Sequence, residues 1–382
     1  MKLKRTYPSV RSRRHGPMLA KSVTIAILTV AGLLAGCADR EGEFFESVVH
    51  EHSAVNFGAY SASAVLTRAG GTFIDADAFD AGDIIGVMGF HHDNSNWVAD
   101  SATIKPNFMY DQEVTKQEDG TWTYSPKKYW PNETGKDAKS EGIDRLSFYG
   151  YYPYSQTGDG KYYNLIIPKN TDTGMGRWEF TVRDKSSEQV DFMLSDLAAD
   201  QVKTKIDQKV ELKFHHVLSQ VTTHIQLADS LKELGCSLTV NQLALTNTLN
   251  HGYCTPTYDG SKTSFNWGDL SGQTTYSTDK EPDSLNRKLL LIPQEISAAV
   301  QASCTYTINF PADSLNPDGY SYEGNTFSVN LKGLVSDAGK AINKWEAGKC
   351  YTYIFTVGLQ EILFDVTVAN WQEREYGLIM DE

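Results

Sequence analysis

Cysteine is scarce in this sequence. Only 5 of its 382 residues are cysteine, too few for the disulfide framework that holds many small secreted domains together. Four of them lie in the second half of the chain: Cys236, Cys254, Cys304 and Cys350. These four could form two disulfides, with three possible connectivities. However, Cys304 alternates with Tyr306 and Ile308 along a predicted strand, and this pattern favours buried free thiols.

Motifs for catalysis, cofactors and metals are also lacking. The sequence contains no zinc-protease helix motif, no nucleophile elbow and no glycine-rich phosphate loop. His215 and His216 are neighbours on a predicted strand, so they point to opposite faces and cannot bind one ion. The segment 91–93 (His-His-Asp) is more typical of a polar loop tip, and the aspartates of residues 75–83 miss the calcium-loop spacing. We expect no enzyme activity, no cofactor and no metal site.

Basic residues are few, above all in the part of the chain that follows residue 36. The whole chain has 35 lysines and arginines against 48 aspartates and glutamates, a formal net charge of −13. Seven of the basic residues and none of the acidic ones lie in residues 1–36, so the rest of the chain carries −20. Such an acidic chain repels the phosphate backbone, and we expect no nucleic-acid partner.

No apolar run suits a permanent membrane span. The run at residues 22–36 would form a helix of about 22 Å, against roughly 30 Å of hydrocarbon core. Because a basic start precedes this run, residues 1–36 are predicted to be a secretory signal. The run ends in L-A-G-C at Cys37, which resembles the bacterial lipobox. The resemblance implies that Cys37 is acylated, for example with palmitate, and anchors a surface-exposed outer-membrane lipoprotein through an acidic tether at residues 37–53.

What the sequence does contain is a strand-like alternation of apolar and polar residues. Val55, Phe57 and Ala59 alternate with polar or small residues, and this period of two recurs along most of the chain. Strands are predicted at 84–90, 121–124, 146–152, 164–167, 178–182, 210–214, 221–227, 289–292, 306–310, 351–357 and 362–371. Short helices are predicted only at 197–202 and 228–234. The pattern predicts an all-β fold of antiparallel sandwiches.

The length of the chain predicts two domains. About 345 residues remain after the signal, more than one ordinary core holds. A polar stretch at residues 199–209 separates two strand-rich blocks. We therefore predict an N-terminal β-sandwich domain at residues 54–207 and a C-terminal one at 208–382. The last segment of the chain, residues 372–382, is a tail with alternating apolar residues: Tyr376, Leu378 and Met380.

A series of motifs extends in order over nearly all of the chain after the signal. They are I-G-V-M-G-F (85–90), D-G-T-W-T-Y-S-P-K-K-Y-W-P (119–131), L-S-F-Y-G-Y-Y-P-Y (146–154), D-F-M-L-S-D (191–196), L-K-F-H-H-V-L-S-Q-V (212–221), L-L-L-I-P-Q (289–294) and W-E-A-G-K-C-Y-T-Y-I-F-T-V (345–357). Together they resemble the fimbrillin (Mfa-like, FimA-like) family of lipoprotein precursors of type V pilus subunits. The resemblance implies two transthyretin-like β-sandwiches and a structural role in a cell-surface fimbrium that contributes to adhesion.

The same resemblance implies a route of assembly. In fimbrillins an arginine-specific protease removes the first strand, and the donor strand of another pilus subunit fills the opened groove. Arg68 is the matching candidate here, because it is the first basic residue after Arg40 and three small residues follow it. The candidate donor strand is the tail at residues 372–382.

The aromatic residues leave one alternative open. Six of them could form a platform on which sugar rings stack: Trp122, Trp130, Tyr149, Tyr151, Tyr152 and Tyr154. The protein would then be a surface glycan-binding lipoprotein that does not polymerise. Strand alternation buries about half of such a run, and this favours packing over a sugar platform.

Acylation of Cys37 can be tested by substitution. Cys37→Ser removes the sulfur of the L-A-G-C motif, so the precursor should stay unprocessed and should not take up a labelled fatty acid. Metabolic labelling and electrophoresis measure both effects. Cys236→Ser is the matched control and should be labelled like the wild type. Labelling that survives Cys37→Ser would contradict the assignment.

Overall fold

The computed structural model describes residues 53–61, 79–131, 144–155, 164–204, 207–278, 288–359 and 362–371. These residues form strands over most of their length, which confirms the all-β fold predicted from the alternation. The helical segments are short: α1 (Trp97–Asp100), α2 (Asp229–Glu233) and the 3-10 turn η1 (Ser186–Glu188). In this part of the chain no helix has the length and apolar character needed to cross a membrane.

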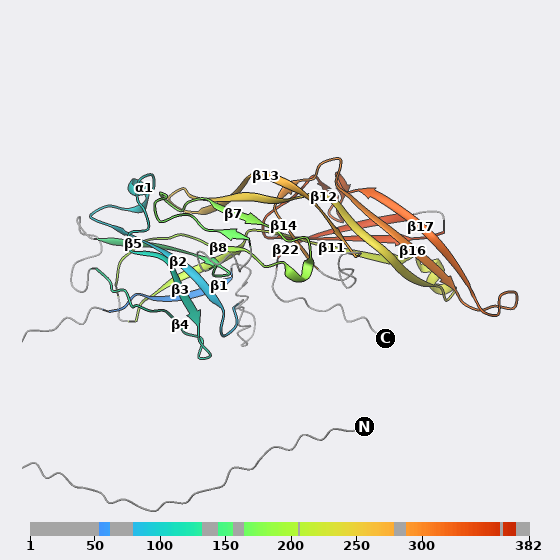
Figure 1. Ribbon diagram of the computed structural model, residues 1–382, viewed down its shortest axis with the longest axis horizontal. Helices are drawn as coiled ribbons and strands as arrows, with labels where there is room; N and C mark the ends of the chain where they lie inside the picture. The colour runs from blue at the N-terminus through green and yellow to red at the C-terminus, as the bar shows by residue number, and fades with distance from the viewer. Residues whose placement is uncertain are drawn as a thin grey trace, which may run out of the picture. The chain divides into compact units, whose positions relative to one another are not determined.

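The largest sheet has eight strands and carries the first strand at its edge (Figure 1). Its order is β1-β10-β8-β5-β2-β3-β4, with β9 paired to β5. The strands are β1 (Asn56–Ser61), β2 (Ile84–His92), β3 (Met109–Lys116), β4 (Trp122–Thr123), β5 (Arg145–Tyr152), β8 (Met193–Ser195), β9 (Ala198–Gln201) and β10 (Lys209–His216). β1 runs parallel to β10, whereas the other described pairings of this sheet are antiparallel.

Both faces of this sheet are buried. In β2, Ile85 and Val87 join one apolar cluster, whereas Met88 and Phe90 join another. Burial on both faces explains why β2 and β5 are nearly continuous apolar runs in the sequence. The first cluster, which we call the N-terminal core, consists of Val55, Phe57, Ala59, Phe79, Ile85, Val87, Met109, Val114, Trp122, Tyr124, Trp130, Leu146, Phe148, Met193, Val210, Leu212 and Phe214.

Two further sheets, together with one face of the eight-stranded sheet, contribute to the second cluster, which we call the main core and which includes Trp178, Phe192, Trp345 and Phe355. One sheet has the order β17-β16-β12-β7-β6, with β13 paired to β12, and the other has the order β14-β11-β21-β22. Two short pairs, β15 with β20 and β18 with β19, complete the described strands. The bounds are β6 (Leu165–Ile166), β7 (Trp178–Thr181), β11 (Ser219–Leu227), β12 (Ser237–Tyr258), β13 (Thr263–Ser277), β14 (Leu289–Leu291), β15 (Gln294–Glu295), β16 (Gln301–Phe310), β17 (Tyr320–Asn330), β18 (Leu334–Val335), β19 (Ala341–Ile342), β20 (Lys344–Trp345), β21 (Lys349–Val357) and β22 (Ile362–Asn370).

Strand pairing crosses the border predicted between residues 207 and 208. β10 begins just after this border, yet it pairs with β1 and β8 in the eight-stranded sheet. β7 precedes the border, yet it pairs with β12 in the second half of the chain. The division into 54–207 and 208–382 is therefore not a boundary between sheets, and the assignment of two domains stays a prediction.

Two predicted helices have different outcomes. The helix predicted at 197–202 is wrong, because residues 198–201 form β9, and pairing with β5 outweighs local preference there. The helix predicted at 228–234 is confirmed as α2. No strand is predicted over most of the long hairpin of β12 and β13, because most of its residues are exposed or half-buried and its apolar alternation is weak.

The four cysteines of the second half are free thiols. Cys236, Cys254 and Cys304 are buried, as the favoured interpretation predicted, and the half-buried Cys350 donates its S–H to Gln220 Oε1 at 2.8 Å. Burial raises the pKa of the Cys254 thiol, and it raises the pKa of Cys304 to about 12. Since the thiolate is the reactive form, these two thiols should react slowly at neutral pH.

Alkylation of the native protein tests this order of reactivity. At about pH 8 a thiol with a strongly raised pKa stays protonated, so iodoacetamide should modify Cys350 first and Cys254 last. In denaturant without reductant, all four should react at similar rates. Peptide mass spectrometry of both samples measures the modified fractions. A disulfide-linked pair among these cysteines would contradict the free-thiol assignment.

Candidate functional site

The edge strand β1 is the candidate functional site. Among the described strands it pairs with β10 alone, through six residue pairs that run from Asn56 opposite Lys209 to Ser61 opposite Phe214. Parallel pairing is slightly less stable per residue than antiparallel pairing. β1 is therefore an edge strand whose loss leaves the other described pairings of this sheet in place.

Alternate side chains of β1 point into the N-terminal core, as the alternation predicted. Phe57 is 1% exposed and Ala59 is 6% exposed. The centroid of the Phe57 ring lies 5.4 Å from that of Phe148, edge to face, and 5.6 Å from that of Tyr124. Aromatic pairs at such distances attract each other beyond the effect of buried area. Phe57 is thus the anchor of β1 in the core.

Hydrogen bonds join the residues just before β1 to the segment that follows β4. The Val55 N–H donates to the Lys128 carbonyl at 2.9 Å, and the Trp130 N–H donates to the Ser53 carbonyl at 3.1 Å. The Tyr124 hydroxyl donates to the Val55 carbonyl at 2.8 Å. These bonds bring the two ends of the eight-stranded sheet together around the N-terminal core.

The outer side of β1 is partly exposed. Gly58 lies opposite Glu211, whose carboxylate occupies the place where a side chain at residue 58 would begin. Tyr60 is 38% exposed. Burial raises the pKa of Tyr60, and the nearby carboxylates of Glu211 and Asp196 raise it further. A small residue at position 58 therefore fits beside Glu211 without displacing its carboxylate.

The contacts of β1 add up to a large free energy. Burial of the Val and Phe side chains stabilises by roughly 1.5–3 kcal/mol each, and about six ladder hydrogen bonds contribute about 1 kcal/mol apiece. The sum, about 9–12 kcal/mol, is an upper estimate, because an unfolded chain already buries part of this surface. Without β1, an apolar groove would run along β10, lined by Tyr124, Phe148 and Leu212.

Several predicted site residues lie outside the described residues. They are Cys37, Arg68 and the tail at 372–382. The described residues stop at Ser61, the end of β1, and resume at Phe79. Arg68 therefore lies in the sequence between β1 and β2. Acylation at Cys37 and cleavage at Arg68 stay predictions.

The two adjacent histidines point to opposite faces, as predicted. His216 is buried, with its ring stacked 4.2 Å from that of Trp371 and its Nδ1 2.6 Å from Asp191 Oδ2. His215 lies on the other face, with Nε2 3.0 Å from Asp196 Oδ2. Over the described ranges, no three His, Cys, Asp or Glu side chains gather in a way that could hold a metal ion.

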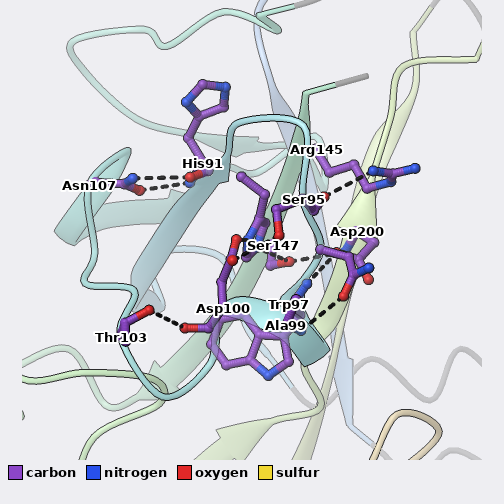
Figure 2. A network of polar contacts seen from close by, with 12 residues as sticks. His91, Ser95, Trp97, Ala99, Asp100, Thr103, Asn107, Arg145, Ser147 and Asp200 are labelled. Atoms are coloured by element: carbon purple, nitrogen blue, oxygen red, sulfur yellow. Dashed lines mark hydrogen bonds and ion pairs between the residues drawn. The ribbon is translucent and has the colours of Figure 1, made fainter. Parts of the chain in front are cut away.

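A buried polar network lies at the end of β2 (Figure 2). The loop predicted at residues 91–93 is wrong for His91 and His92, which end β2, and His92 is fully buried. Its Nδ1 lies 2.8 Å from Asp100 Oδ2, and its Nε2 lies 2.9 Å from Ser147 Oγ. Burial opposes ionisation of Asp100, but hydrogen bonds from His92 and Ser95 outweigh it and lower the pKa of Asp100.

The hydroxyl–imidazole–carboxylate order of this network is that of serine hydrolases. Ser147, however, is fully buried, and its Oγ also accepts the Asp200 N–H at 3.0 Å. Asp200 in turn accepts the Trp97 N–H at 2.8 Å. The structure gives a substrate no access to Ser147, so the network serves to fasten α1 to the sheet. No motif in the sequence indicates this network, because its members come from distant segments, with Trp97 and Asp200 103 positions apart.

The aromatic residues considered for a sugar platform lie in the cores. Trp122, Trp130, Tyr149 and Tyr151 are all buried. The Tyr149 hydroxyl donates to the Met175 carbonyl at 2.5 Å, which satisfies its polar end inside the protein. These four residues pack the fold, as the alternation favoured, while Tyr152 and Tyr154 are half-buried against the same cores.

Comparison with known proteins gives a family for this architecture. A sequence model of the family described as "Fimbrillin-like" matches residues 67–371. A fimbrial protein from Bacteroides vulgatus ATCC 8482 has a similar structure, with 16% identity and a TM-score of 0.55 over 83% of this chain and 99% of that one. The tip fimbrial protein Mfa3 from Porphyromonas gingivalis, with C-terminal truncation, matches with 10% identity and a TM-score of 0.35 over 77% and 96%. No curated protein matches the chain. The similarity to the Bacteroides vulgatus protein shows a shared fold.

Substitution of Phe57 tests its role as the anchor of β1. Phe57→Ala removes the ring that packs between Tyr124 and Phe148, and it should lower the free energy of unfolding by about 3–5 kcal/mol. Urea denaturation followed by tryptophan fluorescence measures the change. Asn56→Ala, on the outer side of the same strand, should cost less than about 1 kcal/mol. Equal costs for the two variants would show that β1 is not anchored through Phe57.

Proposed function

The chain belongs to the fimbrillin-like family, and from this premise we propose that it is a structural subunit of a cell-surface pilus. Proteolytic removal of β1 converts it from a monomeric lipoprotein into a subunit that polymerises by strand exchange. The observation that carries this proposal is the position of β1. It is an edge strand paired in parallel, and yet it fills the N-terminal core through Phe57.

The covalent tether of β1 keeps the uncut chain monomeric. A strand in the same chain competes at a high effective concentration, so a donor strand from another subunit cannot displace it. After a cut between β1 and β2, only non-covalent contacts hold β1 in place. Once β1 leaves, β10 offers an unpaired edge and an apolar groove, and a donor strand from another subunit can satisfy both.

Arg68 is the proposed cleavage site for an arginine-specific protease. It lies between Ser61, where β1 ends, and Ile84, where β2 begins, so a cut there severs no described strand. The residues that follow it, Ala-Gly-Gly, are small enough to take the extended form that proteases bind. Cleavage after Arg68 therefore frees β1 and leaves the other strands of the sheet in one chain.

The same cut also explains release from the membrane. Acylated Cys37 and β1 both lie on the N-terminal side of Arg68. Departure of β1 thus separates the subunit from its lipid anchor on the outer membrane at the moment the groove opens. One cleavage then couples release from the cell surface to entry into the fimbrium.

The proposed donor strand is the tail at residues 372–382 of a second copy or of a related pilus subunit. Eleven extended residues span about 36 Å, whereas the six residues of β1 span about 20 Å. The tail is therefore long enough to replace β1, and its alternating Tyr376, Leu378 and Met380 can face one side.

Arg68→Ala tests the switch. Without an arginine at this position the lipoprotein should reach the cell surface at full length and should not enter polymer. Immunoblots of heat-resistant ladders, together with electron microscopy of the cells, measure assembly. Arg40→Ala, in the tether, is the matched control and should assemble like the wild type. Normal assembly of the Arg68→Ala protein would show that cleavage there is not the switch.

A further inference from the structure

We propose that a pocket at the end of the β16–β17 hairpin (Figure 1) binds a neutral oligosaccharide. The inference goes beyond the pilus function, because this pocket is separate from β1 and does not need its removal. The pocket has a volume of about 600 Å³ and is lined by seven residues, among them Phe310, Asp313, Asn316, Tyr320, Tyr322 and Leu359. Such a volume lies in the range of about 300–1,000 Å³ that is typical of small-molecule sites.

A β-bulge in β17 sets the direction of the two tyrosines. Asn325 lies opposite Tyr306, whereas Tyr322 lies opposite Ile308, so β17 has one extra residue between these pairs. Tyr306 and Ile308 belong to the main core. Tyr322 therefore lies on the core-facing side of the sheet, and so does Tyr320, two residues away. Without the extra residue both rings would point to the opposite side.

The two rings lie on the core-facing side, and yet they are accessible. Tyr320 is 56% exposed and Tyr322 is 42% exposed. Phe310 packs beside Tyr320 with its ring centroid 6.1 Å away, and Leu359, from the turn between β21 and β22, also lines the pocket. Neither tyrosine hydroxyl bonds to another described residue. Both rings and both hydroxyls are thus available to a ligand, and neither residue is among the six aromatic residues considered from the sequence.

The turn between β16 and β17 adds polar groups to the pocket. Asp313 Oδ1 accepts the N–H groups of Leu315 and Asn316, both at 2.7 Å, and the Asp313 N–H donates to the Asn316 carbonyl at 3.0 Å. The hydrogen bonds from Asn316 and Leu315 lower the pKa of Asp313, so its carboxylate is charged at neutral pH. A carboxylate has about four acceptor positions, and Asp313 can therefore accept further hydrogen bonds from a ligand.

This combination of groups matches the chemistry of a sugar. The face of an aromatic ring is electronegative and attracts the C–H groups on one side of a sugar ring. The hydroxyls at the edge of the sugar can donate to the Asp313 carboxylate and pair with the Asn316 amide. Among the described residues that line the pocket none is basic, so an acidic sugar would be repelled by Asp313. The ligand class is therefore a neutral oligosaccharide.

The size of the pocket favours a sugar over a protein partner. Seven residues line it, whereas a stable protein–protein interface has about 20–30 residues on each side. One such site should bind a sugar weakly, but repetition along a filament would strengthen attachment through avidity. Only this gain rests on the function proposed above. Binding to a single chain does not.

The full lipoprotein, purified in detergent, tests the pocket. It is applied to immobilised neutral oligosaccharides of glucose, galactose, mannose, N-acetylglucosamine and fucose, and to sialylated counterparts. At least one neutral oligosaccharide should bind, and calorimetric titration with it in free form measures the affinity. Tyr320→Ala and Tyr322→Ala should each weaken binding about 3–10-fold. Tyr320→Phe keeps the ring and should weaken binding less. Asp313→Asn still accepts the N–H groups of the turn but loses the charge, and it should also weaken binding.

Tyr129→Ala is the matched control, because Tyr129 is 52% exposed and does not line the pocket. It should bind like the wild type, and thermal unfolding should show that all variants are folded. Three results would overturn the proposal: no neutral oligosaccharide binds at millimolar concentrations, the double variant Tyr320→Ala with Tyr322→Ala binds as well as the wild type, or sialylated sugars bind more tightly than neutral ones. If no sugar binds and the double variant fails to polymerise, the pocket is a contact between subunits. Arg68→Ala should bind the sugar like the wild type, so failure of the assembly switch and failure of the pocket are distinguished.

Discussion

The packing of Phe57 against Tyr124 and Phe148 keeps the N-terminal core closed. A sheet edge with unpaired backbone groups invites pairing with another chain, and β1 is what covers the edge of β10. Six residue pairs and one buried ring hold this cover in place. β1 precedes all other described strands of its sheet in the sequence. A cut between β1 and β2 can therefore separate β1 from the chain without breaking another strand.

The rest of the fold is arranged so that loss of β1 has local effects. The main core includes no residue of β1. β2 and β5 are held by neighbours on both sides and are buried on both faces, and the network of His92, Asp100 and Ser147 fastens α1 to them. Removal of β1 therefore exposes one groove in the N-terminal core and leaves the main core closed, which is the condition under which a donor strand can bind to a folded acceptor.

The sequence predicted those parts of the structure whose periodicity is strong. The alternation of Val55, Phe57 and Ala59 identified β1 and its inward face. The opposite orientations of His215 and His216 followed from strand geometry. The helix predicted at 197–202 failed because long-range pairing with β5 decides the conformation there. The parallel partner of β1 and the polar network could not be predicted, because both depend on residues that only the tertiary fold brings together. Cys37 and Arg68 lie outside the described residues, so acylation and cleavage there stay predictions from the sequence.

Mass spectrometry of subunits from purified filaments tests the proposed loss of β1 most directly. Strand removal predicts that the mature subunit begins at Ala69 and that peptides covering residues 53–61 are missing from the filament. It also predicts that the acylated N-terminal fragment is found with the cell membranes. Filament subunits that retain residues 53–61 would contradict removal of β1 as the event that opens the groove.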